Sequence, residues 1–159
     1  MLLPADVVRT IDKYARDDRE AGGILLGRYR MPHVEIVTCS EPMPLDVRTL
    51  IGFDRRDPGH QRDALKLWKV SRRTVTFIGE WHTHPEEVPS PSSIDLSTWA
   101  EAQEAVQHLP LIFVIRGYAG WWFGLGRHGS HLVKLAGISS ESFDGQTAGV
   151  FGRDGLSLV

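Results

Sequence analysis

The sequence predicts a single α/β domain, in which a mixed β-sheet is flanked by helices on both faces. Three observations predict this class. Helical and strand patterns follow one another in the order helix, two strands, helix, strand, helix, then strands. Residues 111–115 form a continuous apolar run, as in a central strand that is covered on both faces. The 159 residues are 42% apolar, which suits one domain with a substantial core.

The N-terminal region predicts one helix followed by two strands. Residues 4–19 carry apolar side chains on one face and charged side chains on the other, as in an amphipathic helix. A Gly-Gly pair then allows a tight turn before a strand over 24–26. Residues 34–38 predict a second strand, paired with the first. Cys39 lies in this alternating run, which favours a buried structural thiol over a nucleophile.

Residues 42–58 contain prolines and charges without a clear period, so they predict a loop or irregular insertion. This insertion carries many apolar side chains for a solvated loop, namely Leu45, Val47, Leu50, Ile51 and Phe53. Two interpretations follow. The apolar side chains pack onto the core, or they form one wall of a groove that binds an extended peptide, with Leu45 and Leu50 as candidate substrate contacts.

The second half of the chain predicts two more helices and a run of strands. Residues 59–72 predict a basic amphipathic helix with Ala64, Leu65, Leu67 and Trp68 turned inward, and its cationic face is interpreted as solvated. The later elements are a strand over 74–81, a helix over 93–107, the strand over 111–115 and further strands over 121–125 and 131–135. Trp99 on the last helix is expected in the core.

Composition excludes several classes of function. The net charge of −2 and pI near 6.4 give no electrostatic reason to expect nucleic-acid binding. A single cysteine cannot form an internal disulfide, no apolar run reaches the ~20 residues of a membrane span, and the N-terminus lacks signal-peptide features. A cytoplasmic protein is therefore expected. Residues 137–159 are rich in Gly and Ser and predict a C-terminal tail, either flexible or an extended arm.

The stretch around His82 and His84 carries the clearest chemical signal. Residues i and i+2 of a strand share a face, so both imidazoles can meet one metal ion. Ser92 and Asp95 follow across a short loop at the spacing of a helix start. They fit a capping box, and Asp95 can also supply a third metal ligand. Three protein ligands leave an open fourth position on zinc, which is typical of a catalytic site.

These residues resemble the JAMM motif of the MPN/JAB1 metalloprotease domain, the family of zinc deubiquitinases. The motif also has an upstream glutamate before a Leu-rich strand, and Glu20 with residues 21–27 matches it. The resemblance covers residues 1–136 and implies a cytidine-deaminase-like sheet, one zinc ion held by His82, His84 and Asp95, Glu20 as general base and Ser92 as oxyanion stabiliser. Without the resemblance, Glu20 is a solvated carboxylate at a helix end.

The small size, Trp81 and the PSPSSxDL run of residues 89–96 also resemble the stand-alone JAB peptidases of bacterial CBASS antiphage operons. That likeness implies hydrolysis of the amide bond after the C-terminus of a conjugated cGAS/DncV-like nucleotidyltransferase or a ubiquitin-like protein. The alternatives are a peptidase that trims a sulfur-carrier protein and a non-catalytic MPN scaffold. A zinc deaminase is excluded because its PCxxC ligand pair needs more cysteines than Cys39. The expected partner is a protein with an extended C-terminal tail, not a nucleic acid or a membrane.

Overall fold

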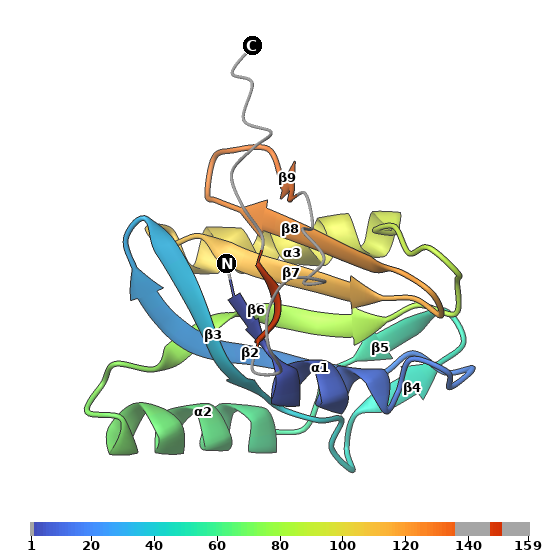
Figure 1. The fold of residues 1–159 in the computed structure, drawn as a ribbon, viewed down its shortest axis with the longest axis horizontal. Coiled ribbons are helices and arrows are strands. Elements are labelled where there is room, and N and C mark those ends of the chain that lie inside the picture. The colour runs from blue at the N-terminus through green and yellow to red at the C-terminus, as the bar shows by residue number, and fades with distance from the viewer. Residues whose placement is uncertain (1, 136–146, 151–159) are drawn as a thin grey trace.

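The computed structural model describes residues 2–135 and 147–150, in which an eight-stranded mixed sheet forms the middle of the molecule (Figure 1). Its strand order is β10-β1-β3-β2-β6-β7-β8-β9. The strands are β1 (Leu2–Pro4), β2 (Gly22–Arg30), β3 (His33–Cys39), β6 (Thr76–Thr83), β7 (Leu111–Arg116), β8 (Trp121–Gly126), β9 (Val133–Lys134) and β10 (Thr147–Val150). The pairs β1–β3 and β6–β7 are parallel, and the other pairs are antiparallel.

Three helices cover the two faces of this sheet: α1 (Ala5–Asp12), α2 (Gly59–Val70) and α3 (Ser93–Ala105). Alternation along β2 shows the division, because Leu25 packs in one core cluster with α1, whereas Ile24 and Leu26 pack with α2 on the other face. The α3 side chain Trp99 packs on the β7 and β8 residues that face away from α1. The predicted α/β class with helices on both faces is therefore confirmed.

The central strands carry the core. All five residues 111–115 are buried, as the apolar run predicted. Trp99 is 1% exposed and stacks on Phe113 and Trp122 with ring centroids 4.4 and 5.4 Å apart, so its predicted core position is confirmed.

Several predicted elements differ from the structure. The first helix ends at Asp12, because the following N–H groups of Tyr14 and Ala15 bond three residues back and turn the chain. The glycine pair lies inside β2 and not in a turn. Glycine is needed at both positions because a side chain would collide with the backbone carbonyl of Trp81 or of Ser40. Leu65 of α2 is 50% exposed and does not face inward.

The predicted insertion contains a small antiparallel hairpin, β4 (Val47–Thr49) and β5 (Gly52–Asp54). Leu45 and Leu50 are both 62% exposed, so the interpretation that the apolar side chains of this segment pack onto the core is wrong for them. A buried carboxylate fixes the hairpin instead. The side chain of Asp46 has no exposed surface, accepts the N–H groups of residues 43, 56 and 57, and pairs with His60 at 2.8 Å.

An extra residue in β6 sets which side chains face the site. Ile78 and Gly79 together oppose Leu25 of β2, which is a β-bulge. As a result Ile78 and Trp81 both pack on the α1 face, although they are three residues apart. Glu80 and His82 alternate with Trp81 and therefore lie on the opposite face, towards α3.

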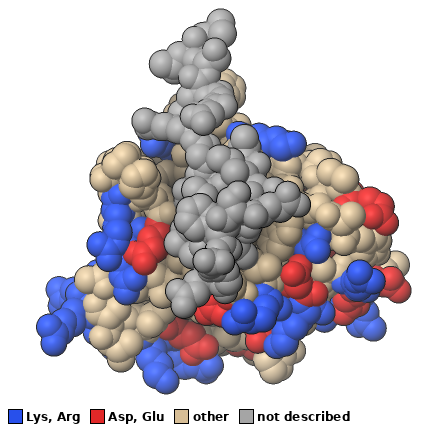
Figure 2. Space-filling model, in the orientation of Figure 1, with Lys and Arg blue, Asp and Glu red and all other residues tan. Residues whose placement is uncertain are grey.

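Most of the predicted tail lies outside the described residues, so the domain boundary at residue 136 stays a prediction. Within the tail, β10 pairs with β1. In the described part of the chain, no helix has the length and apolar character needed to cross a bilayer. On the face seen in Figure 2, Lys and Arg side chains are interspersed with Asp and Glu.

Candidate metal centre

The two motif histidines lie where β6 ends. His82 is inside the strand, paired with Gly22 of β2 and Ile115 of β7. His84 follows the strand, and its N–H donates to the Arg116 carbonyl at 3.0 Å, which keeps the backbone extended up to Pro85. His82 and His84 are 7% and 5% exposed, so both imidazoles lie in the protein interior at the end of the sheet.

The third predicted ligand comes from the first turn of α3. The Asp95 N–H donates to Ser92 Oγ at 3.1 Å, and the Ser92 N–H donates to Asp95 Oδ2 at 2.7 Å, which is a complete capping box. The Ser92 hydroxyl also lies 2.7 Å from Asp95 Oδ2. Capping and ligation therefore do not exclude each other, because the cap fixes the carboxylate beside the histidines.

Glu20 reaches the same place from just before β2. Its N–H donates to the Thr49 carbonyl at 2.8 Å, and its own carbonyl accepts from Arg48 Nε at 3.0 Å. Both contacts come from β4, so the hairpin holds the backbone of Glu20. Glu20 is 7% exposed, so its carboxylate is buried and is not the solvated carboxylate expected at a helix end.

Four side chains converge on one point. The Nε2 atoms of His82 and His84 lie 3.0 Å apart, and each lies 3.3 Å from an oxygen of Asp95. Glu20 Oε1 is 3.8 Å from His84 Nε2, and donor atoms of Glu20, His82 and His84 all lie within 4.8 Å of one another. Two ring nitrogens that face each other amid carboxylates are satisfied together by a bound cation. Imidazole and carboxylate groups are ligands for divalent metals, so the donor set fits a metal ion.

The carboxyl groups of Glu20 and Asp95 have pKa values that are shifted in opposite directions. Burial raises the pKa of the Glu20 carboxyl above its usual range, and the nearby His84 and His82 only partly offset this effect. Burial also opposes ionisation of Asp95, but hydrogen bonds from His82, His84 and Ser92 outweigh it and lower the Asp95 pKa. Asp95 is thus an anion that can hold a cation, whereas Glu20 is suited to accept and return a proton.

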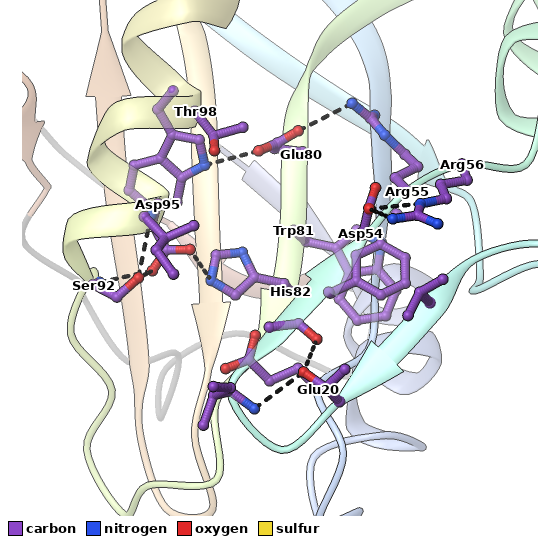
Figure 3. Close-up of a pocket in the computed structure, with 18 residues that line it drawn as sticks. Glu20, Asp54, Arg55, Arg56, Glu80, Trp81, His82, Ser92, Asp95 and Thr98 are labelled. Carbon is purple, nitrogen blue, oxygen red and sulfur yellow. Dashed lines mark hydrogen bonds and ion pairs between the residues drawn. The ribbon is translucent and has the colours of Figure 1, made fainter.

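A groove of about 570 Å³ leads to this point, between the hairpin and the N-terminal half of α3 (Figure 3). The hairpin lines it through Val47, Ile51 and Phe53, and α3 lines it through Ile94 and Thr98 among others. Leu45 and Leu50 do not line it, so their role in substrate binding stays a prediction.

Sequence reasoning did not single out two contributors to this site. Arg48 holds Glu20, and Glu80 lines the groove two residues before His82 on the same face. The period of two along a strand would have indicated Glu80. Cys39 is half-buried and not fully buried as predicted, but burial and neighbouring acids raise the pKa of its thiol to about 12, which agrees with a structural thiol and not a nucleophile. The buried His60 is hydrogen-bonded to Ser40 and Asp46.

The sequence of this chain is similar to a known protein family and to several named proteins. Residues 4–125 match the family described as prokaryotic homologues of the JAB domain. A CD-NTase/cGAS isopeptidase of Escherichia coli is 35% identical over 127 residues, covering 78% of this chain and 80% of that protein. A CD-NTase/cGAS isopeptidase of Pseudomonas aeruginosa is 44% identical over 82 residues, or 52% of each chain.

The fold alone is also found in a solution structure of a Desulfitobacterium hafniense protein. It superposes with a TM-score of 0.52 at 20% identity and covers 82% of this chain and 86% of that one.

Proposed function

The chain belongs to the family of prokaryotic homologues of the JAB domain, and from this premise we propose that it is a zinc-dependent isopeptidase. Its substrate would be a conjugated CD-NTase/cGAS-like nucleotidyltransferase, since the relatives bear the name CD-NTase/cGAS isopeptidase. We infer that the nucleotidyltransferase is joined through its C-terminus to another molecule. The reaction is hydrolysis of the amide bond at that junction, which reverses conjugation in antiviral defence.

The observation that carries the proposal is the convergence of His82, His84, Asp95 and Glu20 on one point. His82, His84 and Asp95 are assigned as the metal ligands, because their donor atoms lie 3.0–3.3 Å from one another. His82 and Asp95 of this set also line the groove (Figure 3). Three ligands from N and O donors with one open position are the arrangement of catalytic zinc sites.

The remaining groups provide the proton transfers. Zinc, when bound, supplies a Lewis acid that lowers the pKa of a water molecule toward 7 and polarises the scissile carbonyl. Glu20, held by the hairpin beside His84, takes the proton of the attacking water and returns it to the departing amine nitrogen. The amine needs this proton because an unprotonated amide nitrogen is a very poor leaving group.

Ser92 is placed for a second role. Its hydroxyl donates to Asp95 Oδ2 in the structure, and Ser92 lines the groove. A rotation of the hydroxyl would let it donate to the negative oxygen of the tetrahedral intermediate instead. Loss of one such donor typically lowers kcat by about 10²–10³.

The groove indicates an extended substrate segment. Its walls come from the hairpin and α3, and apolar side chains on both walls, such as Phe53 and Ile94, are suited to contact the side chains of a substrate tail. A sulfur-carrier protein with an extended C-terminus would fit the same geometry, so it is the second candidate substrate. A non-catalytic scaffold is less well supported, because all five motif residues are present and Glu20 is buried at the site.

The test uses the full chain, purified without chelators. The probe is a CD-NTase/cGAS-like nucleotidyltransferase, fused through its last residue to a reporter protein. We expect cleavage at the junction, located by mass spectrometry, loss of cleavage with a chelator, and recovery with Zn²⁺. Matched fusions of ubiquitin and of a sulfur carrier are the controls. Cleavage of the sulfur-carrier fusion alone would overturn the proposed nucleotidyltransferase substrate. If the zinc-loaded protein cleaves no fusion, the proposed isopeptidase activity is overturned.

A further inference from the structure

Glu80 lies between the two walls of the groove, and both of its carboxylate oxygens are engaged. Oε1 accepts the indole N–H of Trp99 at 2.8 Å, and Oε2 pairs with Arg55 Nη2 at 3.2 Å (Figure 3). Its side chain is only 16% exposed, so solvent screens these contacts less than it would on an open surface. Glu80 therefore makes two charge-assisted contacts in opposite directions.

The contact with Trp99 concerns the metal centre. Trp99 lies one turn after Asp95 on α3, and its ring packs on Phe113 and lies 5.8 Å from the His82 ring. The bond from Trp99 to Glu80 joins α3 to β6, the strand that carries His82. This bond thus fixes the helix that presents one ligand relative to the strand that presents another.

The contact with Arg55 concerns the groove. Arg55 directly follows β5, so it belongs to the hairpin that forms the opposite wall. The same carboxylate that joins α3 to β6 also ties the end of this hairpin to β6. Neither contact is needed for the capping box or for the bonds that hold Glu20.

We propose that Glu80 is a positioning residue, which through Trp99 sets the distance between Asp95 and the histidines and through Arg55 sets the width of the groove. The first half concerns metal affinity and is independent of what the protein cleaves. The second half rests on the proposed function, because it predicts binding of an extended tail. Outer-shell partners of this kind typically change metal affinity or activity by about 10–100-fold when they are lost.

The two oxygens of Glu80 can be separated by substitution. Glu80→Ala removes both contacts, whereas Glu80→Gln keeps an oxygen for the Trp99 N–H and turns an amide NH₂ toward Arg55. Trp99→Phe removes only the indole donor and keeps an aromatic ring, and Arg55→Gln removes only the cation. Glu101→Ala is the matched control, since Glu101 is an exposed acid on α3, the helix that carries Trp99, and does not line the groove.

Zn²⁺ affinity is measured by competition with a chromophoric chelator, and KM and kcat with the CD-NTase fusion. We expect about tenfold weaker zinc binding in Glu80→Ala and Trp99→Phe, and near-normal binding in Glu80→Gln, Arg55→Gln and Glu101→Ala. We expect a raised KM with unchanged kcat in Glu80→Gln and Arg55→Gln. Far-UV circular dichroism checks that each variant is folded.

Unchanged zinc affinity in folded Glu80→Ala would overturn the first half, and so would a Glu80→Gln affinity as weak as that of Glu80→Ala. Unchanged KM in Arg55→Gln would overturn the second half. If no fusion is cleaved by the parent protein, the proposed function fails, but the zinc titrations still decide the role of Glu80 at the metal centre.

Discussion

Two carboxylates compete for the role of third metal ligand, and paired substitutions decide between them. Asp95 lies 3.3 Å from both Nε2 atoms, whereas Glu20 approaches only His84, at 3.8 Å. Glu20 nevertheless groups with both histidines within 4.8 Å, so it is geometrically able to ligate. Our assignment makes Asp95 the ligand and Glu20 the general base. It predicts opposite outcomes for Asp95→Asn and Glu20→Gln.

The magnitudes follow from the two roles. A general base contributes typically 10²–10⁴ in rate, so Glu20→Gln should lower kcat by that factor, or about 3–5 kcal/mol of barrier. Its zinc affinity should stay within a few-fold, because the amide fills the same buried space. Asp95→Asn removes one of three ligands, so its zinc affinity should fall by more than the ~10–100-fold that loss of an outer-shell partner costs.

The assay is a Zn²⁺ titration against a chromophoric chelator, together with single-turnover cleavage of the CD-NTase fusion. Glu87→Gln is the control, since Glu87 is an exposed acid in the neighbouring loop and its loss should change neither quantity. The reverse pattern, with zinc lost in Glu20→Gln and kept in Asp95→Asn, would refute the assignment of both residues.

Two further predictions concern the hairpin. Arg48→Ala removes the donor to the Glu20 carbonyl, so kcat should fall about tenfold. Bound zinc, measured by mass spectrometry of the native protein, should stay at one per chain. Parallel loss of zinc would contradict this role of Arg48. Asp46→Asn should lower the free energy of unfolding in urea by about 1–3 kcal/mol at pH 7. Burial opposes ionisation of Asp46, but bonds from backbone N–H groups and His60 outweigh it and lower its pKa, so this stabilisation is present above about pH 4 and lost as the pH falls further. A difference between Asp46→Asn and the parent protein that does not narrow below pH 4 would show that the carboxylate charge is not the cause.

The sequence was sufficient for the parts of the site that local geometry fixes. The period of a strand puts His82 and His84 on one face, and the spacing of a capping box brings Asp95 to the first turn of a helix. Glu20 could be found only through family resemblance, because its approach to His84 depends on the pairing of β2 with β6. No local pattern records such a pairing. The contacts of Arg48 and Arg55 arise in the same way, from a hairpin that folds back over a distant strand.

The β-bulge in β6 explains why a strict period of two misplaces Ile78, the residue just before the strand segment that carries the site. An unbroken strand would put Ile78 on the same face as Glu80 and His82. The extra residue moves Ile78 to the α1 face, and Gly79 makes this possible at φ +147° with its Cα close to the Ile112 backbone. Any side chain at position 79 would collide with the Ile112 carbonyl. A lone glycine within an apolar strand pattern is the sequence sign of such a bulge. Gly79 therefore acts on the site only through this bulge, which keeps Ile78 off the face that carries Glu80 and His82, and it contributes no chemistry of its own.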